Sequence, residues 1–266
     1  LLGTSRLAWS PDSTLRGFFK GTTHCLSALL AAQRHDDLLE LLAMAPYDLW
    51  HYRKFGVQAL AALGRKSEAI RYAEAGQGAY DSPVAVAQTC EAILLSSGMV
   101  DEAYRRYGLL ANRTGTYVAW YRAVAKKYPQ IPPAQILDDL VASTPGEEGK
   151  WFAAAKQAGL FDEAIALAQR SPCAPQTLTR AARDFAEKNP PFALEAGMAA
   201  VHWLVAGYGY DVTAADVLDA YTHTLAAAER LGRAETTRQR IRDLVAKETG
   251  GERFVTRALG RHLGLA

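Results

Sequence analysis

The sequence predicts an all-α fold, an α-solenoid of about seven antiparallel helix pairs. Apolar residues recur at helical spacing, as in Leu49, Tyr52, Gly56, Leu60 and Leu63. The alternating β-branched pattern that is typical of strands is missing. Prolines stop one helix and open the next, and they divide the chain into segments of roughly 10 to 20 residues. The breaks are Ala45-Pro46, Ser82-Pro83, Tyr128-Pro129, Pro132-Pro133, Thr144-Pro145-Gly146, Ser171-Pro172 and Asn189-Pro190-Pro191.

Composition is that of an ordinary globular protein. The 266 residues are 49% hydrophobic and 22% charged, and no apolar run approaches the roughly 18 residues that span a bilayer. A chain of this size needs neither disulfide nor metal for stability. Cys25, Cys90 and Cys173 lack metal-ligand spacing, so we expect buried, reduced thiols and a cytoplasmic location. Because the chain begins with Leu1 and shows no signal peptide, we expect part of a longer or processed protein.

A local pattern returns three times along the chain. Each copy places Gly at the end of one helix, Ser or Asp as the cap of the next helix, and then Glu-Ala. Weaker copies stand near Gln33 and Gly232, and the uneven spacing of the turns predicts two more, near residues 128 and 190. The three clear copies are Leu63-Gly64-Arg65-Lys66-Ser67-Glu68-Ala69-Ile70, Ser97-Gly98-Met99-Val100-Asp101-Glu102-Ala103-Tyr104 and Ala158-Gly159-Leu160-Phe161-Asp162-Glu163-Ala164-Ile165.

This pattern resembles the tetratricopeptide repeat, whose unit carries a Gly-x-x-[Asp/Ser]-Glu-Ala turn. The resemblance implies a right-handed superhelix of helix pairs whose inner surface binds a protein or peptide. The position at which that family has a small residue in its first helix is occupied by Val57, Glu91 and Phe152. We therefore expect a single domain over 1–266, with a lead-in helix in 1–22, repeats in 23–190 and longer, less regular helices in 191–266. Ser10-Pro11-Asp12 is expected to open a helix.

The resemblance also indicates which residues face a partner. In such repeats the first helix of each pair lines the inner surface, at positions 13, 10, 6 and 3 residues before the turn glycine. We predict binding residues that favour an acidic segment through Lys54 and Lys156. Counting back from the turn glycines gives His51, Lys54, Gln58 and Ala61, then Ala85, Gln88, Ala92 and Leu95, with Lys156 before Gly159.

A second interpretation concerns the basic end of the chain. The net charge is +2, but Glu229 to Ala266 holds nine Lys and Arg against five Asp and Glu. Arg253, Arg257 and Arg261 recur every four residues and predict a basic stripe on a last helix. This stripe favours an acidic partner, and a regulatory or nucleic-acid-binding domain is the alternative function.

No residues stand out as catalytic, and no cofactor or metal is expected. The nearest approach to a metal-ligand pattern is His24 with His35-Asp36, and Asp36 is better explained as a helix cap. The sequence contains no phosphate loop and no Gly-x-Ser-x-Gly elbow. A helical enzyme built from scattered residues remains the third alternative.

Overall fold

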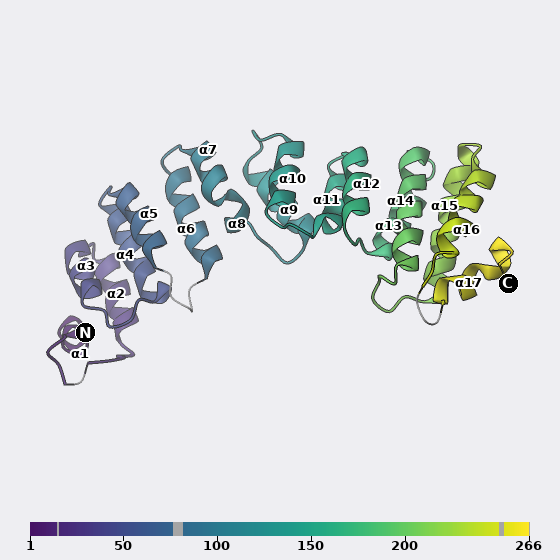
Figure 1. Cartoon of the computed structure of the whole chain (residues 1–266). Helices are drawn as coiled ribbons and strands as arrows, with labels where there is room; N and C mark the ends of the chain where they lie inside the picture. The colour runs from purple at the N-terminus through teal and green to yellow at the C-terminus, as the bar shows by residue number, and fades with distance from the viewer. Residues whose placement is uncertain (15, 77–81, 250–252, 266) are drawn as a thin grey trace. The chain divides into compact units, whose positions relative to one another are not determined.

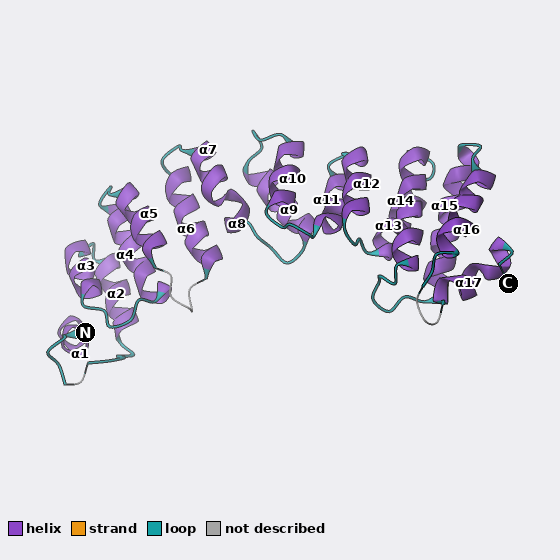
Figure 2. Ribbon diagram, viewed as in Figure 1, coloured by secondary structure: helices purple, strands orange, loops and turns teal. Residues whose placement is uncertain are grey.

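In the computed structural model every regular element is a helix (Figure 2), within the described residues 1–14, 16–76, 82–249 and 253–265. The all-α prediction is therefore confirmed for that part of the chain. The chain divides into two compact units, Leu1–Arg113 and Thr114–Ala266, each described here by itself. The division falls inside the range 23–190 that was expected to hold the repeats.

Unit 1 consists of a short first helix followed by helix pairs (Figure 1). Within the pairs, α2 contacts α3, α4 contacts α5, and α6 contacts α7, η1 and α8. The expected helix start at Ser10 is wrong, because Ser10 instead follows the end of α1. The elements are α1 (Leu2–Trp9), α2 (Thr22–Ala31), α3 (His35–Ala43), α4 (Trp50–Ala62), α5 (Lys66–Ala75), α6 (Pro83–Leu95), α7 (Val100–Ala103), the π-helical turn η1 (Tyr104–Gly108) and α8 (Leu109–Ala111).

Unit 2 continues with helix pairs (Figure 1). The turns expected near residues 128 and 190 fall between α9 and α10 and between α13 and α14. Of the helices in 191–266 that were expected to be longer, α14 and α15 have 16 and 17 residues, whereas α16 and α17 have 12 and 10. The elements are α9 (Tyr117–Lys127), α10 (Pro133–Ala142), the 3-10 helix η2 (Glu148–Trp151), α11 (Phe152–Gln157), α12 (Phe161–Arg170), α13 (Pro175–Phe185), α14 (Pro190–Val205), α15 (Ala214–Arg230), α16 (Ala234–Val245) and α17 (Phe254–Leu263).

Each unit has its own apolar core. In unit 1, Trp9 is fully buried and meets the edge of Tyr52, with ring centroids 5.1 Å apart. In unit 2, the ring centroids of Phe161 and Phe192 are 4.8 Å apart, and the two rings pack helix α12 against helix α14. Aromatic pairs of this kind hold neighbouring helix pairs together, because one pair alone cannot bury its apolar face.

The turn glycines take the predicted left-handed conformation. The φ angles of Gly64, Gly98 and Gly159 are +77°, +73° and +78°. In the first turn the Arg65 amide donates to the Leu60 carbonyl at 2.9 Å, and the other two turns contain the equivalent bond. This is the Schellman arrangement, which satisfies carbonyls at the helix end. The prediction is confirmed, and the weaker copies at Gln33 and Gly232 have the same geometry, with φ of +57° and +65°.

The predicted helix caps are wrong. Ser67, Asp101 and Asp162 are the second residues of α5, α7 and α12, and Asp36 is the second residue of α3. The residue before each of these helices donates its amide back into the preceding helix, so the next helix begins at once. The acidic side chains therefore lie in first turns, where they interact with the positive end of the helix dipole.

Candidate functional site

A groove of about 500 Å³ lies between α4 and α6 in unit 1. Of the eight positions counted back from Gly64 and Gly98, six line it. Both helices are the first helix of their pair. The lining residues are Trp50, Lys54, Val57, Gln58, Ala61, Ala85, Gln88, Thr89, Ala92, Ile93 and Ser96.

The groove combines an apolar floor with polar walls. Val57 is fully buried and Ile93 is 8% exposed, so both belong to its base. Gln58 is exposed, and Lys54 is half-buried with its ammonium 5.3 Å from the centre of the Phe55 ring. No ion pair of Lys54 occurs within the described residues. The groove can therefore offer a cation and an amide to an extended chain, between small side chains that leave room for it.

Two of the predicted binding residues already have protein partners. His51 lies outside the groove lining, and its Nε2 is 2.8 Å from the Thr23 hydroxyl. Gln88 lines the groove, but its side-chain amide donates to the Ala111 carbonyl at 3.1 Å. Gln88 therefore also ties α6 to the end of α8. Lys54 and Gln58 are left as the polar groups best placed for a ligand.

Lys156 does not belong to this groove. It lies on α11 in unit 2, whereas every lining residue is in unit 1. Its ammonium is 5.9 Å from the centre of the Phe185 ring, a cation–π contact within unit 2.

A buried polar pair escaped the sequence interpretation. Glu91 is 1% exposed, and its Oε1 accepts a hydrogen bond from Asn112 Nδ2 at 2.7 Å. The same nitrogen donates to the Gly108 carbonyl at 2.7 Å, at the end of η1. Asn112-Arg113-Thr114 is also a glycosylation sequon, and a glycan would replace one of the two Nδ2 hydrogens, so both bonds could not be kept. The signal in the sequence was Glu91 itself, a charged residue at a position where the resemblance to the tetratricopeptide repeat implies a small one.

A second groove, of about 260 Å³, lies between α13 and α15 in unit 2. These are again the first helices of consecutive pairs. All of its lining residues are polar: Gln176, Thr179, Arg180, Arg183, Asp216, Asp219 and His223.

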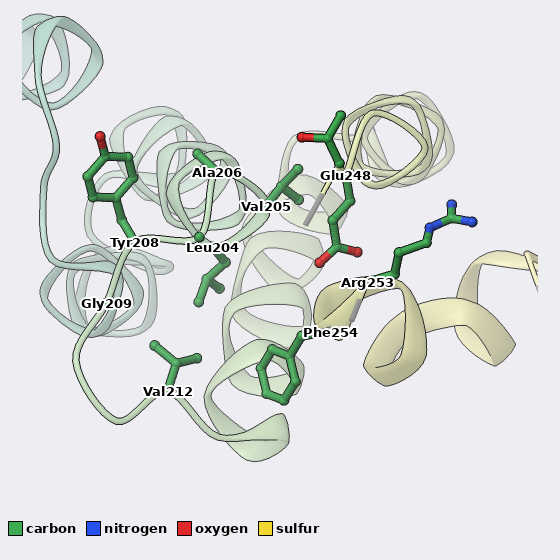
Figure 3. A pocket seen from close by; sticks show the side chains of 11 residues that line it. Leu204, Val205, Ala206, Tyr208, Gly209, Val212, Glu248, Arg253 and Phe254 are labelled. Carbon is green, nitrogen blue, oxygen red and sulfur yellow. The ribbon is translucent and has the colours of Figure 1, made fainter. Parts of the chain in front are cut away.

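The C-terminal part of unit 2 contains a third hollow, of about 490 Å³ (Figure 3). It lies between the end of α14 with its following loop on one side and Glu248, Thr249, Arg253 and Phe254 on the other. Glu248 extends into this region and accepts hydrogen bonds from the Val255 and Thr256 amides at 2.9 and 2.8 Å. The carboxylate thus caps α17 and is not available to a ligand.

The predicted arginine stripe is only partly present. Arg253 precedes α17 with a left-handed backbone, φ +44°, and so is not on the helix, which corrects the three-residue stripe. Arg257 and Arg261 are exposed on α17. The pattern failed at Arg253 because the α17 cap comes from Glu248, outside the helix, and fixes the first helical residue as Phe254.

In the described part of the chain, no three His, Cys, Asp or Glu side chains lie close enough to hold a metal. The three cysteines are buried, as expected. Burial raises the pKa of Cys173 to about 12 and also raises the pKa of Cys90, so both thiols stay protonated and poorly nucleophilic.

None of the helices in the described residues is long and apolar enough to cross a membrane.

Comparison with known proteins finds no match to this chain among protein-family models, curated proteins or solved structures.

Proposed function

We propose that the protein is a non-catalytic scaffold of the tetratricopeptide-like type, an α-solenoid that binds an acidic peptide segment of a partner protein. The observation that carries the proposal is the groove between α4 and α6. Residues chosen only by their distance from two turn glycines meet there in one cavity. The pairing of consecutive helices within each unit and the shared turn geometry support the same proposal.

The preference for an acidic ligand follows from the charges around the groove. Among the described residues that line the groove, Lys54 is the one that carries a charge. A carboxylate near Lys54 gains attraction in a partly desolvated site, while Gln58 can bond to the peptide backbone. Ala61, Ala85 and Ala92 keep the groove wide enough for a chain to lie between the helices.

The test is binding of labelled nonapeptides to the full chain, measured by fluorescence anisotropy. One peptide alternates Glu with Thr, and the other alternates Gln with Thr. Ala61→Trp fills the groove and should weaken binding of the acidic peptide at least about tenfold. Lys54→Glu should weaken the acidic peptide about fivefold and leave the neutral one unchanged.

Matched controls lie next to the test positions. Ala62 is exposed on α4 outside the groove, so Ala62→Trp should leave binding intact. Arg71 is exposed on α5, and Arg71→Glu makes the same charge change as Lys54→Glu away from the groove. Equal effects of Ala61→Trp and Ala62→Trp, at unchanged melting temperature, would place the binding surface elsewhere.

A further inference from the structure

The groove between α13 and α15 has walls of opposite charge. Arg180 and Arg183 line it from α13, and Asp216 and Asp219 line it from α15. In the part of the chain that the structure describes, no ion pair joins the two walls. The charges face the same space of about 260 Å³ without neutralising one another.

Three of these charged groups are held along their own helices. Arg183 pairs with Asp184 at 2.9 Å, and Arg180 donates to the Thr177 hydroxyl at 3.2 Å. Asp216 accepts from the Thr213 amide and hydroxyl in a capping box, and these bonds lower its pKa. The side chains are thereby kept on their own walls, and the space between them stays open.

We propose that this groove binds an extended peptide segment in which an acidic residue stands directly beside a basic one. The proposal does not depend on the groove in unit 1. Along an extended chain, successive side chains point to opposite sides. Adjacent Glu and Lys therefore meet the arginine wall and the aspartate wall at the same time, whereas Glu and Lys two residues apart point to the same wall.

The length of the groove fits such a segment. Its lining residues extend from Gln176 to Arg183 on α13 and from Asp216 to His223 on α15. At 1.5 Å per helical residue this is about 10 Å, the length of about three residues of extended chain.

A second copy of the chain is the competing occupant. A patch with one positive and one negative side is self-complementary in charge about a two-fold axis. Two concave surfaces placed face to face would nevertheless enclose empty space, so the shape favours an inserted segment.

The experiment uses the full chain and two fluorescein-labelled nonapeptides of Ser and Thr. One carries Glu-Lys at its centre and the other Glu-Thr-Lys, so that composition is nearly the same and only the spacing of the charges differs. The Glu-Lys peptide should bind more tightly. Arg180→Glu and Asp219→Lys should each weaken its binding about fivefold, and the double variant should restore part of the loss, because positions 180 and 219 then again carry opposite charges on opposite walls.

Lys188→Glu and Glu229→Lys are the matched controls, since both residues are exposed in unit 2 outside the groove. They should leave the affinity unchanged. Equal affinity for the two peptides, no rescue by the double variant, or equal effects of test and control reversals would overturn the proposal. So would sedimentation velocity showing a dimer that the single reversals dissociate.

Discussion

The Tyr107 hydroxyl donates a hydrogen bond to Glu74 Oε1 at 2.6 Å, which joins the π-helical turn η1 to α5. Tyr107 is 8% exposed, whereas Glu74 is exposed, so removing the hydroxyl takes away a hydrogen bond from a buried tyrosine to a charged acceptor. We expect Tyr107→Phe to lower the free energy of unfolding by about 1–2 kcal/mol in urea denaturation. Tyr210 is 88% exposed, and Tyr210→Phe should have no measurable effect. Equal stability of the two variants would contradict the prediction.

Because of the Glu74 carboxylate, we expect the stability of the fold to depend on pH in the acid range. Burial opposes the charged form of Glu74, but hydrogen bonds from Tyr107 and Arg106 outweigh it and lower its pKa below the ordinary 4.5. Its contribution to stability is therefore present above about pH 4.5 and is lost as the pH falls through the folded-state value. Thermal melts from pH 7 to pH 3 should show the native chain losing its advantage over Glu74→Gln only at the acid end. A constant difference across that range would show that the ionised form of Glu74 is not what matters.

Replacing a turn glycine should destabilise the fold through backbone strain alone. An added Cβ at Gly64, Gly98 or Gly159 meets no atom within 4 Å, but the positive φ strains any L-residue. Replacing one of them with Ala should destabilise by about 1 kcal/mol in chemical denaturation. Gly3 also has open space around it and lies inside α1 without a positive φ, so Gly3→Ala should be neutral or slightly stabilising. A similar loss at Gly3 would attribute the effect to something other than φ.

Gly197 is sensitive for a steric reason. A Cβ there would lie 2.2 Å from Thr224 Oγ1 and 3.1 Å from the Thr224 Cα, where α14 and α15 cross. We expect Gly197→Ala to cost about 1–3 kcal/mol. The cost should be smaller in a Thr224→Ala background, because the closest clashing atom is gone. Strict additivity of the two changes in a double-mutant cycle would contradict this account.

Substitutions of the two groove glutamines should have different effects, one on stability and the other on peptide binding. Gln88→Ala removes the bond to the Ala111 carbonyl and should destabilise unit 1 by about 1 kcal/mol. Gln58→Ala removes an exposed side chain and should leave the melting temperature unchanged while weakening peptide binding. Calorimetry and anisotropy on both variants check this, and a stability loss at Gln58 would give that residue a structural role instead.

Much of the fold could be predicted because its signals are local. A turn such as Leu60 to Arg65 closes within six residues, so the sequence around Gly64 contains nearly all of its physics. The helical period then places Lys54 and Gln58 on one face, and both line the groove, whereas His51 and Lys156 do not. The predicted helix caps were wrong because each helix begins earlier than expected. The turns are too short to leave a separate capping residue, so the expected caps lie inside the first turns of the helices.

The remainder depends on partners distant in sequence. His51 bonds to Thr23 in the preceding helix pair, and Glu91 bonds to Asn112 after the π-helical turn. Neither pairing has a periodic signal, because tertiary packing decides which side chains meet. The second groove was missed for the same reason: the charges on α13 and α15 are far apart in the chain and share a cavity only after α14 has packed against both helices.

The Schellman turns also bear on how quickly the chain can fold. Each turn closes through bonds between residues no more than five positions apart, such as Arg65 to Leu60 and Met99 to Leu94. Little loop-closure entropy is lost before the two helices of a pair meet, so a pair can form early and then accept its neighbour. Because these contacts are local, we expect the chain to fold on the order of milliseconds or faster.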